Sequence, residues 1–388
     1  MRVETCFGID PASGRTSCVR YAATVEEALA APDASPGPER AFLSAGWIDL
    51  QVNGYAGVDY NSPRTPIEDI GRSIPEIHKS GVTRFFPTII TGPPEEMCGA
   101  LRNLAAAKER LREGRSMEGF HVEGPHISAE DGPRGAHPVH CVRPPDLEEF
   151  RRWQDAARGN VRIVTLAPEW PEAPKYIEAI VKEGVIASIG HTAANSEQIR
   201  AAVSAGATMS THLGNGAHFL MPRHPNCIWD QLAEDRLAAG LIADGVHLPG
   251  SFLRAAIRAK GVSRAFVVTD AVMPAGCLPG RYRVGTVDVD LLPPGDRVVV
   301  AGTHRLAGSA LHMYRAVEIL VRLAGLDVGE AVTMATLTPA RAAHVQGRED
   351  GLARGQRADI TRFTFDAGSG AVTVLETIVD GESVYRAG

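Results

Sequence analysis

The sequence contains no apolar run of about 18 residues, the length that a membrane-spanning helix needs. Its N-terminus also lacks a basic segment followed by an apolar one, which is the pattern of a secretory signal. The six cysteines are scattered over 388 residues and form no C-x-x-C pair, so a disulfide framework is not expected. These absences predict a soluble, cytoplasmic protein.

Several binding and catalytic patterns are missing as well. The net charge of -6 and the lack of a basic tail give no general attraction for nucleic acid or for an anionic membrane. The glycine-rich segment N-G-Y-A-G-V-D-Y-N contains neither a G-x-G-x-x-G nor a P-loop pattern, and no G-x-S-x-G element supports a serine hydrolase. The expected partner is therefore a small molecule, handled by chemistry other than that of an activated serine.

The chain has an ordinary globular composition, with 44% hydrophobic and 22% charged residues, and can bury a sizeable core. Helical periodicity separates most of its short apolar runs, and Gly81, Gly184, Gly206 and Gly261 stand where a helix C-cap glycine belongs. The runs with strand character lie near residues 46–52, 82–89, 119–123, 161–166, 185–190, 207–212, 239–244 and 265–270. Eight β/α repeats in this order predict an α/β fold, a (β/α)8 TIM-type barrel.

The two ends of the chain have a different pattern. Strand character is present around Met1 to Phe7 and Arg15 to Tyr21, and A-P-D-A-S-P-G-P-E-R is typical of a loop. Near the C-terminus, A-V-T-V-L-E-T-I-V-D-G-E-S-V-Y alternates and turns like antiparallel strands. We predict that residues 1–45 and 351–388 form one small β-sandwich domain beside a barrel of residues 46–350.

Four polar residues stand at the ends of predicted barrel strands, namely Glu123, His191, His212 and Asp270. The carboxyl ends of parallel strands share one face of a barrel, where active sites are assembled. One carboxylate and two imidazoles suit Zn²⁺ or a similar first-row ion, with a position left open for water. Asp270 beside them can take a proton from that water and deliver it to a leaving amine. The set predicts a metal-dependent amide hydrolase.

Each of these residues also has a simpler interpretation. A histidine at a strand end is often hydrogen-bonded and structural, a glutamate before Gly-Pro is commonly a turn residue, and Asp270 can be a helix N-cap. These interpretations would have to coincide at four strand ends of one barrel. The joint interpretation as a site is therefore favoured.

Several motifs follow one another in a family-specific order: G-W-I-D-L-Q-V-N-G, H-V-E-G-P, G-A-H-P, I-G-H-T, T-H-L-x-N, I-A-D-G-V-H, V-T-D-A, L-A-G-S-A-L and T-P-A-R-A. From about residue 46 to the C-terminus, the chain resembles the N-acetylglucosamine-6-phosphate deacetylases of the amidohydrolase superfamily. The resemblance implies hydrolysis of the N-acetyl group of N-acetylglucosamine-6-phosphate to glucosamine-6-phosphate and acetate.

The resemblance also implies roles for individual residues. Glu123, His191 and His212 would be the ligands of a divalent metal, most simply Zn²⁺, with Fe²⁺, Co²⁺ or Mn²⁺ as alternatives. Asp270 would be the catalytic acid and base, and His137, in G-A-H-P, would help to polarise the acetyl carbonyl.

The end of the first strand bears on the number of metal ions. Many amidohydrolases place H-x-H there to hold a second metal, whereas this chain has Gln51-Val52-Asn53. Neutral amides are poor zinc ligands beside imidazole or carboxylate. We therefore expect one metal, as in the Gln-containing branch of the family, with Gln51 as a hydrogen-bonded residue lining the mouth.

The same resemblance implies a substrate site and an assembly. The residues that would bind the sugar phosphate and the rest of the substrate are Gln51, Ala136, Asn215, Gly216, Arg223, His247 and Leu306. Related enzymes can take this arginine from the neighbouring subunit, which implies a homodimer. The chain departs from the family after His212, where T-H-L-G-N-G-A-H-F-L-M-P-R-H-P replaces T-H-L-F-N-A-M and adds His218 and His224.

This departure bears on the group at the 6-position of the sugar and leaves two alternatives open. One is the same amide hydrolysis on an unphosphorylated or different N-acyl amino sugar or amine. The other is a barrel that has lost catalysis and serves as a binding protein. The intact set of Glu123, His191, His212 and Asp270 argues against the second alternative.

Overall fold

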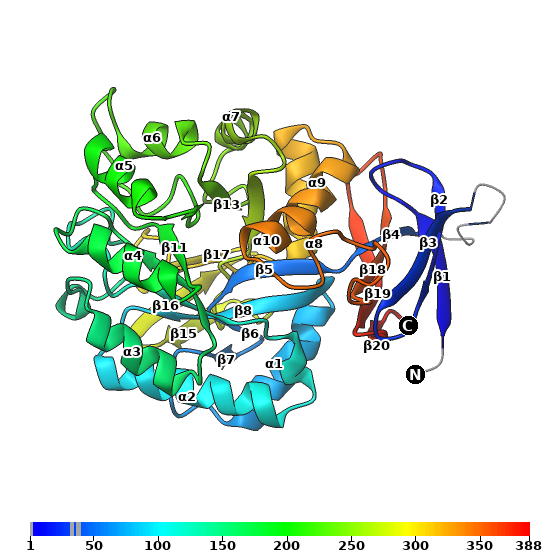
Figure 1. The fold of residues 1–388 in the computed structure, drawn as a ribbon, viewed down its shortest axis with the longest axis horizontal. Helices are drawn as coiled ribbons and strands as arrows, with labels where there is room; N and C mark the ends of the chain where they lie inside the picture. The colour runs from blue at the N-terminus through cyan, green and yellow to red at the C-terminus, as the bar shows by residue number, and fades with distance from the viewer. Residues whose placement is uncertain (1–2, 32–34, 36–39) are drawn as a thin grey trace.

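The computed structural model of the chain describes residues 3–31, 35 and 40–388, and its larger part is a barrel of parallel strands (Figure 1). The strand order around the barrel follows the chain order. Val52, at the end of the first strand, pairs with Ala271, just beyond the end of the last strand, and closes the ring. All eight predicted runs are barrel strands: β5 (Trp47–Val52), β8 (Val82–Ile90), β9 (Phe120–Glu123), β10 (Val161–Leu166), β11 (Ile186–Ile189), β12 (Met209–Ser210), β13 (Ala238–Ile242) and β14 (Ala265–Val268).

Helices cover the outside of the barrel because each carries an apolar stripe, as in α2, where Met97, Leu101 and Leu104 are buried. The four predicted cap glycines all have positive φ, between 73° and 112°. The helices are α1 (Ile67–His78), α2 (Pro94–Arg110), α3 (Leu147–Ala156), α4 (Ala173–Lys182), α5 (Ser196–Ser204), α6 (Cys227–Ala233), α7 (Gly250–Lys260), α8 (Met313–Ile319), α9 (Val328–Ala335) and α10 (Leu337–Ala342).

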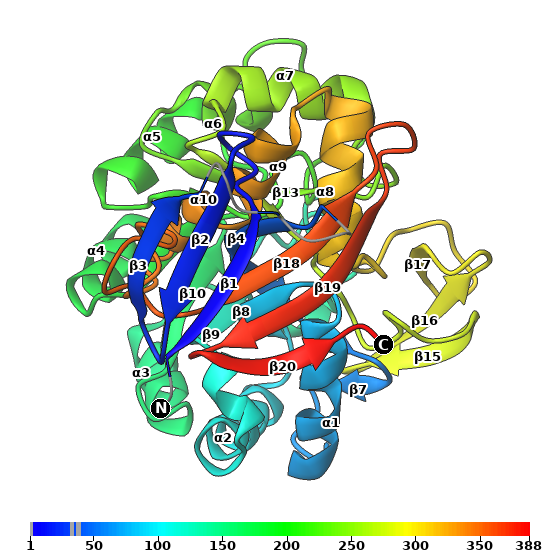
Figure 2. The ribbon, with the colours of Figure 1, turned by 90° about the vertical axis from the view of Figure 1, so that its right-hand side faces the viewer.

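The two ends of the chain meet in one seven-stranded sheet beside the barrel (Figure 2). They join where β4 pairs antiparallel with β18, with Ala45 opposite Ile360. The strands are β1 (Glu4–Ile9), β2 (Thr16–Tyr21), β3 (Val25–Ala30), β4 (Phe42–Ala45), β18 (Ile360–Phe365), β19 (Val372–Val379) and β20 (Glu382–Arg386). The predicted start at Met1 and most of the predicted loop over 31–40 lie outside the described residues, and the domain boundaries at 45 and 351 stay predictions.

A buried ion-pair cluster fixes this sheet to the barrel. Arg84 of β8 donates to Asp359 through Nε at 2.6 Å and Nη2 at 3.0 Å. Arg348 donates to the same carboxylate at 2.6 Å. Burial alone raises the pKa of Asp359, but the two guanidinium groups lower it by more than burial raises it. The resulting pKa is well below the usual range. Asp359 is therefore charged and anchors both parts of the chain.

The chain segment between β14 and α8 forms a three-stranded antiparallel sheet that was not predicted. It consists of β15 (Gly280–Val284), β16 (Val287–Leu292) and β17 (Arg297–Val300), and projects from the side of the barrel in Figure 2. We call it the lid sheet. The alternating segment V-D-V-D-L-L and the P-P-G turn after it are strand and turn signals that the sequence does carry.

Two further expectations can be compared with the structure. All six cysteines are unpaired thiols, as their scattered positions predicted. In the described part of the chain, no helix is long and apolar enough to cross a membrane.

Candidate active site

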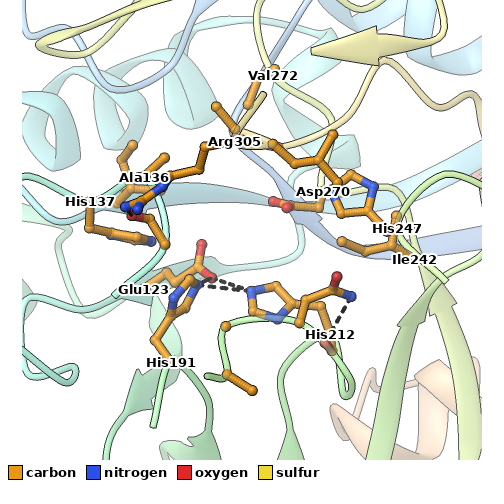
Figure 3. Close-up of a pocket in the computed structure, with 18 of the residues that line it drawn as sticks. Glu123, Ala136, His137, His191, His212, Ile242, His247, Asp270, Val272 and Arg305 are labelled. Atoms are coloured by element: carbon orange, nitrogen blue, oxygen red, sulfur yellow. Dashed lines mark hydrogen bonds and ion pairs between the residues drawn. The ribbon is translucent and has the colours of Figure 1, made fainter. Parts of the chain in front are cut away.

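Three side chains of metal-ligand type converge at the mouth of the barrel. Glu123 is the last residue of β9, and His191 and His212 each follow the end of their strand by two residues. Glu123 Oε1 lies 3.1 Å from His191 Nε2 and 2.8 Å from His212 Nε2 (Figure 3). Their three ligand atoms lie within 4.8 Å of one another, and all three residues are buried. The predicted triplet is therefore brought together.

The backbone at this site is strained. His191, His212 and Asp270 have φ values of 49°, 30° and 50°, in the left-handed region that residues other than glycine rarely adopt. Each such residue costs about 1–3 kcal/mol and persists where the surrounding structure enforces it, commonly at functional sites. Here the conformation occurs where the chain leaves β11, β12 and β14 and turns polar side chains into the mouth.

The hydrogen bonds of the triplet fit a bound cation. His191 Nδ1 lies 2.8 Å from the Pro133 carbonyl oxygen, which can only accept, so Nδ1 carries the proton. In the neutral ring, Nε2 then presents a lone pair to the cluster. Burial alone raises the pKa of Glu123, but its contacts with the two imidazoles hold that pKa well below its usual range. A carboxylate oxygen and two imidazole nitrogens suit one divalent first-row metal ion.

Gln51 supports the site from the side of β5. Its Nε2 donates to Glu123 Oε2 at 3.0 Å and to Asp270 Oδ1 at 3.1 Å. The amide is thus hydrogen-bonded between two carboxylates, which agrees with the expectation of one metal ion. The predicted hydrogen bonding of Gln51 is confirmed, but it is not among the residues that line the cavity, and its contact with substrate stays a prediction.

Asp270 faces the triplet across the cavity (Figure 3). Its Oδ1 also accepts a hydrogen bond of 2.7 Å from Asn53 Nδ2. Burial and the charge of Glu123 raise the pKa of Asp270 to about 6. Asn53 lines the cavity, and its Oδ1 is buried without a hydrogen-bond partner among the described residues. The sequence analysis gave Asn53 no role of its own; its only signal was its place in the segment that replaces H-x-H.

His137 lies on the other side of the cavity, close to the triplet. The centroids of its ring and that of His191 are 4.4 Å apart, and its Nδ1 lies 2.8 Å from Thr91 Oγ1. Burial and the neighbouring His191 lower the pKa of His137 to about 3. The ring is therefore neutral at physiological pH and can offer one N–H group.

The cavity above these residues has a volume of about 540 Å³. The predicted residues that line it, besides the triplet, His137 and Asp270, are Ala136, Asn215, Gly216, His247 and Leu306. His247 donates through Nδ1 to Asp244 at 2.6 Å. Of the two extra histidines, His218 lines the cavity and His224 does not.

Arg223 is exposed and is not among the residues that line the cavity of this single chain. Its predicted contact with a phosphate therefore stays a prediction.

The sequence analysis missed one wall of the cavity. Arg305, in the segment after β17, donates to Gly135 O at 2.9 Å and to Asp131 Oδ1 at 2.7 Å. In Figure 3 it reaches over the cavity toward Ala136 and His137. On the same wall, the sequence analysis also missed His304 and a set of aliphatic residues: Ile90, Val272, Val284, Val287 and Val289. Three of them belong to the lid sheet, which the sequence analysis left uninterpreted.

Comparisons with known proteins agree with this geometry. Residues 42–384 match the Amidohydrolase family. The chain is 35% identical to N-acetylglucosamine-6-phosphate deacetylase of Bos taurus over 359 residues, covering 89% of this chain and 84% of the relative. It is 34% identical to N-acetylgalactosamine-6-phosphate deacetylase of Shewanella sp. (strain ANA-3) over 348 residues, with coverage of 89% and 84%.

A solved structure is similar as well. It is a mutant of N-acetyl-D-glucosamine-6-phosphate deacetylase from Mycobacterium smegmatis in complex with N-acetyl-D-glucosamine-6-phosphate. It superposes with a TM-score of 0.88 at 30% identity and covers 99% of this chain and 100% of its own. The predicted barrel fold and the family resemblance are confirmed.

Proposed function

This chain belongs to the amidohydrolase family, and we propose that it is a mononuclear metal-dependent deacetylase of N-acetylglucosamine-6-phosphate. The observation that carries the proposal is the convergence of Glu123, His191 and His212, with Asp270 facing them across one cavity. The named relatives, which act on N-acetylated amino-sugar 6-phosphates, support the substrate class. Zn²⁺ is the proposed ion, since the donor set suits it, and Fe²⁺, Co²⁺ and Mn²⁺ are the alternatives.

The protein's part in the reaction centres on Asp270. A divalent ion held by the triplet supplies a Lewis acid that polarises a carbonyl and acidifies a water. With a pKa of about 6, Asp270 is a carboxylate at neutral pH and can accept a proton from the attacking water. Gln51 and Asn53 both donate to its Oδ1, which leaves Oδ2 to carry the proton to the leaving nitrogen.

His137 and Asn53 are placed to hold the amide from its two ends. His137 can donate through Nε2 to the acetyl carbonyl if its Nδ1 accepts from the Thr91 hydroxyl, with which it shares a 2.8 Å contact. The unpartnered Oδ1 of Asn53 can accept the amide N–H. The two contacts would orient the acetamide with its carbonyl toward the triplet.

The phosphate is proposed to lie beyond the ends of β12 and β13, where Asn215, Gly216 and His247 line the cavity. Arg223 would complete this site from a second copy in a homodimer. Support for such an assembly comes from exposed apolar side chains nearby: Phe219 and Leu220 of the same loop are 80% and 92% exposed, and Trp229 of α6 is 53% exposed. Apolar side chains this exposed are typical of an interaction surface.

N-acetylgalactosamine-6-phosphate is a second candidate substrate. The specific observation is that the Shewanella relative, which carries that name, is 34% identical over the same share of this chain as the Bos taurus relative. The two sugars differ only in the configuration of one hydroxyl group.

The test is acetate release by Zn²⁺-loaded enzyme from N-acetylglucosamine-6-phosphate, N-acetylgalactosamine-6-phosphate and N-acetylglucosamine. We expect the highest kcat/KM for the first sugar and a large loss for the unphosphorylated one. Equal kcat/KM values for N-acetylglucosamine-6-phosphate and N-acetylglucosamine would show that the enzyme does not recognise the phosphate. No acetate from any of the three, with metal bound, would remove the substrate class.

A further inference from the structure

The cavity wall opposite the proposed phosphate site is aliphatic. Around the closed ring of eight strands, β8 is four strands away from β12, so the end of β8 lies across the mouth from Asn215. Ile90, the last residue of β8, is in register with Glu123. We define the acyl-side wall as the aliphatic residues that line the cavity there and in the neighbouring lid sheet: Ile90, Val272, Val284, Val287 and Val289.

Contacts at the tip of the lid sheet place its valines beside β8. Gly285, in the turn between β15 and β16, donates its N–H to Asp59 Oδ2 at 2.7 Å. Asn61 follows Asp59 by two residues, and its Oδ1 accepts a hydrogen bond of 2.7 Å from the Ile90 N–H. A Cβ at Gly285 would lie 3.7 Å from the Asn61 Cβ, which is van der Waals distance. The turn between Val284 and Val287 thus packs on Asn61, the residue that is hydrogen-bonded to Ile90.

The acyl-side wall also separates two cavities. A second cavity of about 290 Å³ lies behind it, and Ile90 and Val287 line both. Both side chains are half-buried, whereas Val284 and Val289 are 4% and 1% exposed. Ile90 and Val287 therefore stand between the active-site cavity and further space.

We propose that this enzyme also hydrolyses amino-sugar 6-phosphates whose unbranched N-acyl chain is longer than acetyl, namely propanoyl and butanoyl. The inference rests on the proposed function, which puts the sugar phosphate at Asn215 and His247. An acyl chain on the other side of the scissile C–N bond then points to the acyl-side wall. Added methylenes gain free energy by leaving water for an aliphatic surface.

The reaction needs no further reagent. The water oxygen bonds to the acyl carbon and the C–N bond breaks. One proton of the water passes to the nitrogen, which leaves as the amine, and the other is released when the new carboxylic acid ionises. The products are the amino-sugar phosphate and the short-chain carboxylate, with no change of oxidation state.

The experiment compares kcat/KM for N-acetyl-, N-propanoyl- and N-butanoyl-glucosamine-6-phosphate, with detection of the released amine. We expect the two longer substrates to lie within about tenfold of the acetyl substrate, the lower end of what one methylene is worth in a hydrophobic pocket. Val287→Phe fills the wall and should lower the butanoyl-to-acetyl ratio by about tenfold or more.

Val300→Phe is the matched control for this variant. Val300 lies in the same lid sheet, is half-buried like Val287, and lines neither cavity. It should leave the butanoyl-to-acetyl ratio as in the wild type. Val287→Ala, a smaller change, should raise the ratio and serves if the phenylalanine variant does not fold.

The outcomes separate this inference from the proposed function. Cleavage of the acetyl substrate with a loss of more than about 100-fold for the longer chains would overturn the inference and leave the deacetylase intact. Longer chains accepted equally by wild type and Val287→Phe would show that the acyl-side wall does not receive them. No cleavage of any of the three substrates would overturn both.

Discussion

His191 Nε2 and His212 Nε2 lie 3.1 Å apart, and both face the same oxygen of Glu123. Since His191 keeps its proton on Nδ1, its Nε2 has only a lone pair to offer. Two nitrogen ligands and a carboxylate oxygen at such short separations are well suited to enclose a cation. A bound cation would therefore offset the negative charge of Glu123 and the two nitrogen lone pairs at this site.

Metal content should be one ion per chain. Elemental analysis of purified protein is expected to give about one equivalent, because Gln51 is hydrogen-bonded between two carboxylates where a second ligand set would be needed. A chelator should abolish activity, and one equivalent of Zn²⁺ should restore it. An ion present at 1,000 times its Kd should also stabilise the fold by about 4 kcal/mol. Two tightly bound ions, or full activity after chelation, would contradict this.

Activity should fall on acidification as Asp270 is protonated. The pKa of Asp270 is raised to about 6, so the carboxylate is lost as the pH falls through that value. We therefore expect kcat/KM to fall on the acid side of its pH profile. The fall should come at or below pH 6, because a bound cation favours the carboxylate. Asn53→Ala removes a 2.7 Å hydrogen bond to the charged form and should move this fall to higher pH. A pH profile of both enzymes tests this, and a fall at the same pH in both would contradict it.

Arg305→Ala should lower kcat without unfolding the protein. Arg305 donates hydrogen bonds to Gly135 and Asp131. The loop that contains these two residues also carries His137 and the Pro133 carbonyl that orients His191. The part-buried hydrogen bond from the charged Arg305 to Gly135 O is the contact that matters most, and its loss should lower kcat by about tenfold. Zn²⁺ affinity should weaken as well.

The matched control is Arg297→Ala, which changes an exposed arginine of the lid sheet, eight residues before Arg305. If this variant loses as much activity as Arg305→Ala, the effect belongs to the lid charge in general and not to the contacts with the His137 loop.

Asp359→Asn should destabilise the whole chain. Removing one partner of a buried ion pair costs about 3–5 kcal/mol, because Arg84 and Arg348 keep their buried charges. The pKa of Asp359 is depressed, so its stabilisation is full above the unfolded pKa of about 4 and is lost as the pH falls toward the folded value. Urea unfolding at pH 7 and pH 3 should therefore show a smaller difference between variant and wild type in acid. A constant difference would contradict the assignment.

The barrel and the triplet were predictable because both follow from local pattern. Apolar strands that end in a polar residue placed Glu123, His191 and His212 at one face without any three-dimensional information. The closure of the cavity was not predictable in this way. Arg305 meets Gly135 across 170 residues of chain, and no periodicity of either segment indicates that contact. Arg223, assigned from family resemblance, is exposed and does not line the cavity of the single chain, so its contact with a phosphate stays a prediction.

The most direct test is acetate release from N-acetylglucosamine-6-phosphate by wild type and Asp270→Asn at equal measured Zn²⁺ content. If Asp270 moves the proton, kcat should fall by about 100- to 10,000-fold, the usual contribution of a general acid–base group, with KM and metal content little changed. A variant that keeps its kcat within about tenfold of the wild type would contradict this role. A wild-type enzyme that holds its metal and releases no acetate would contradict the deacetylase itself.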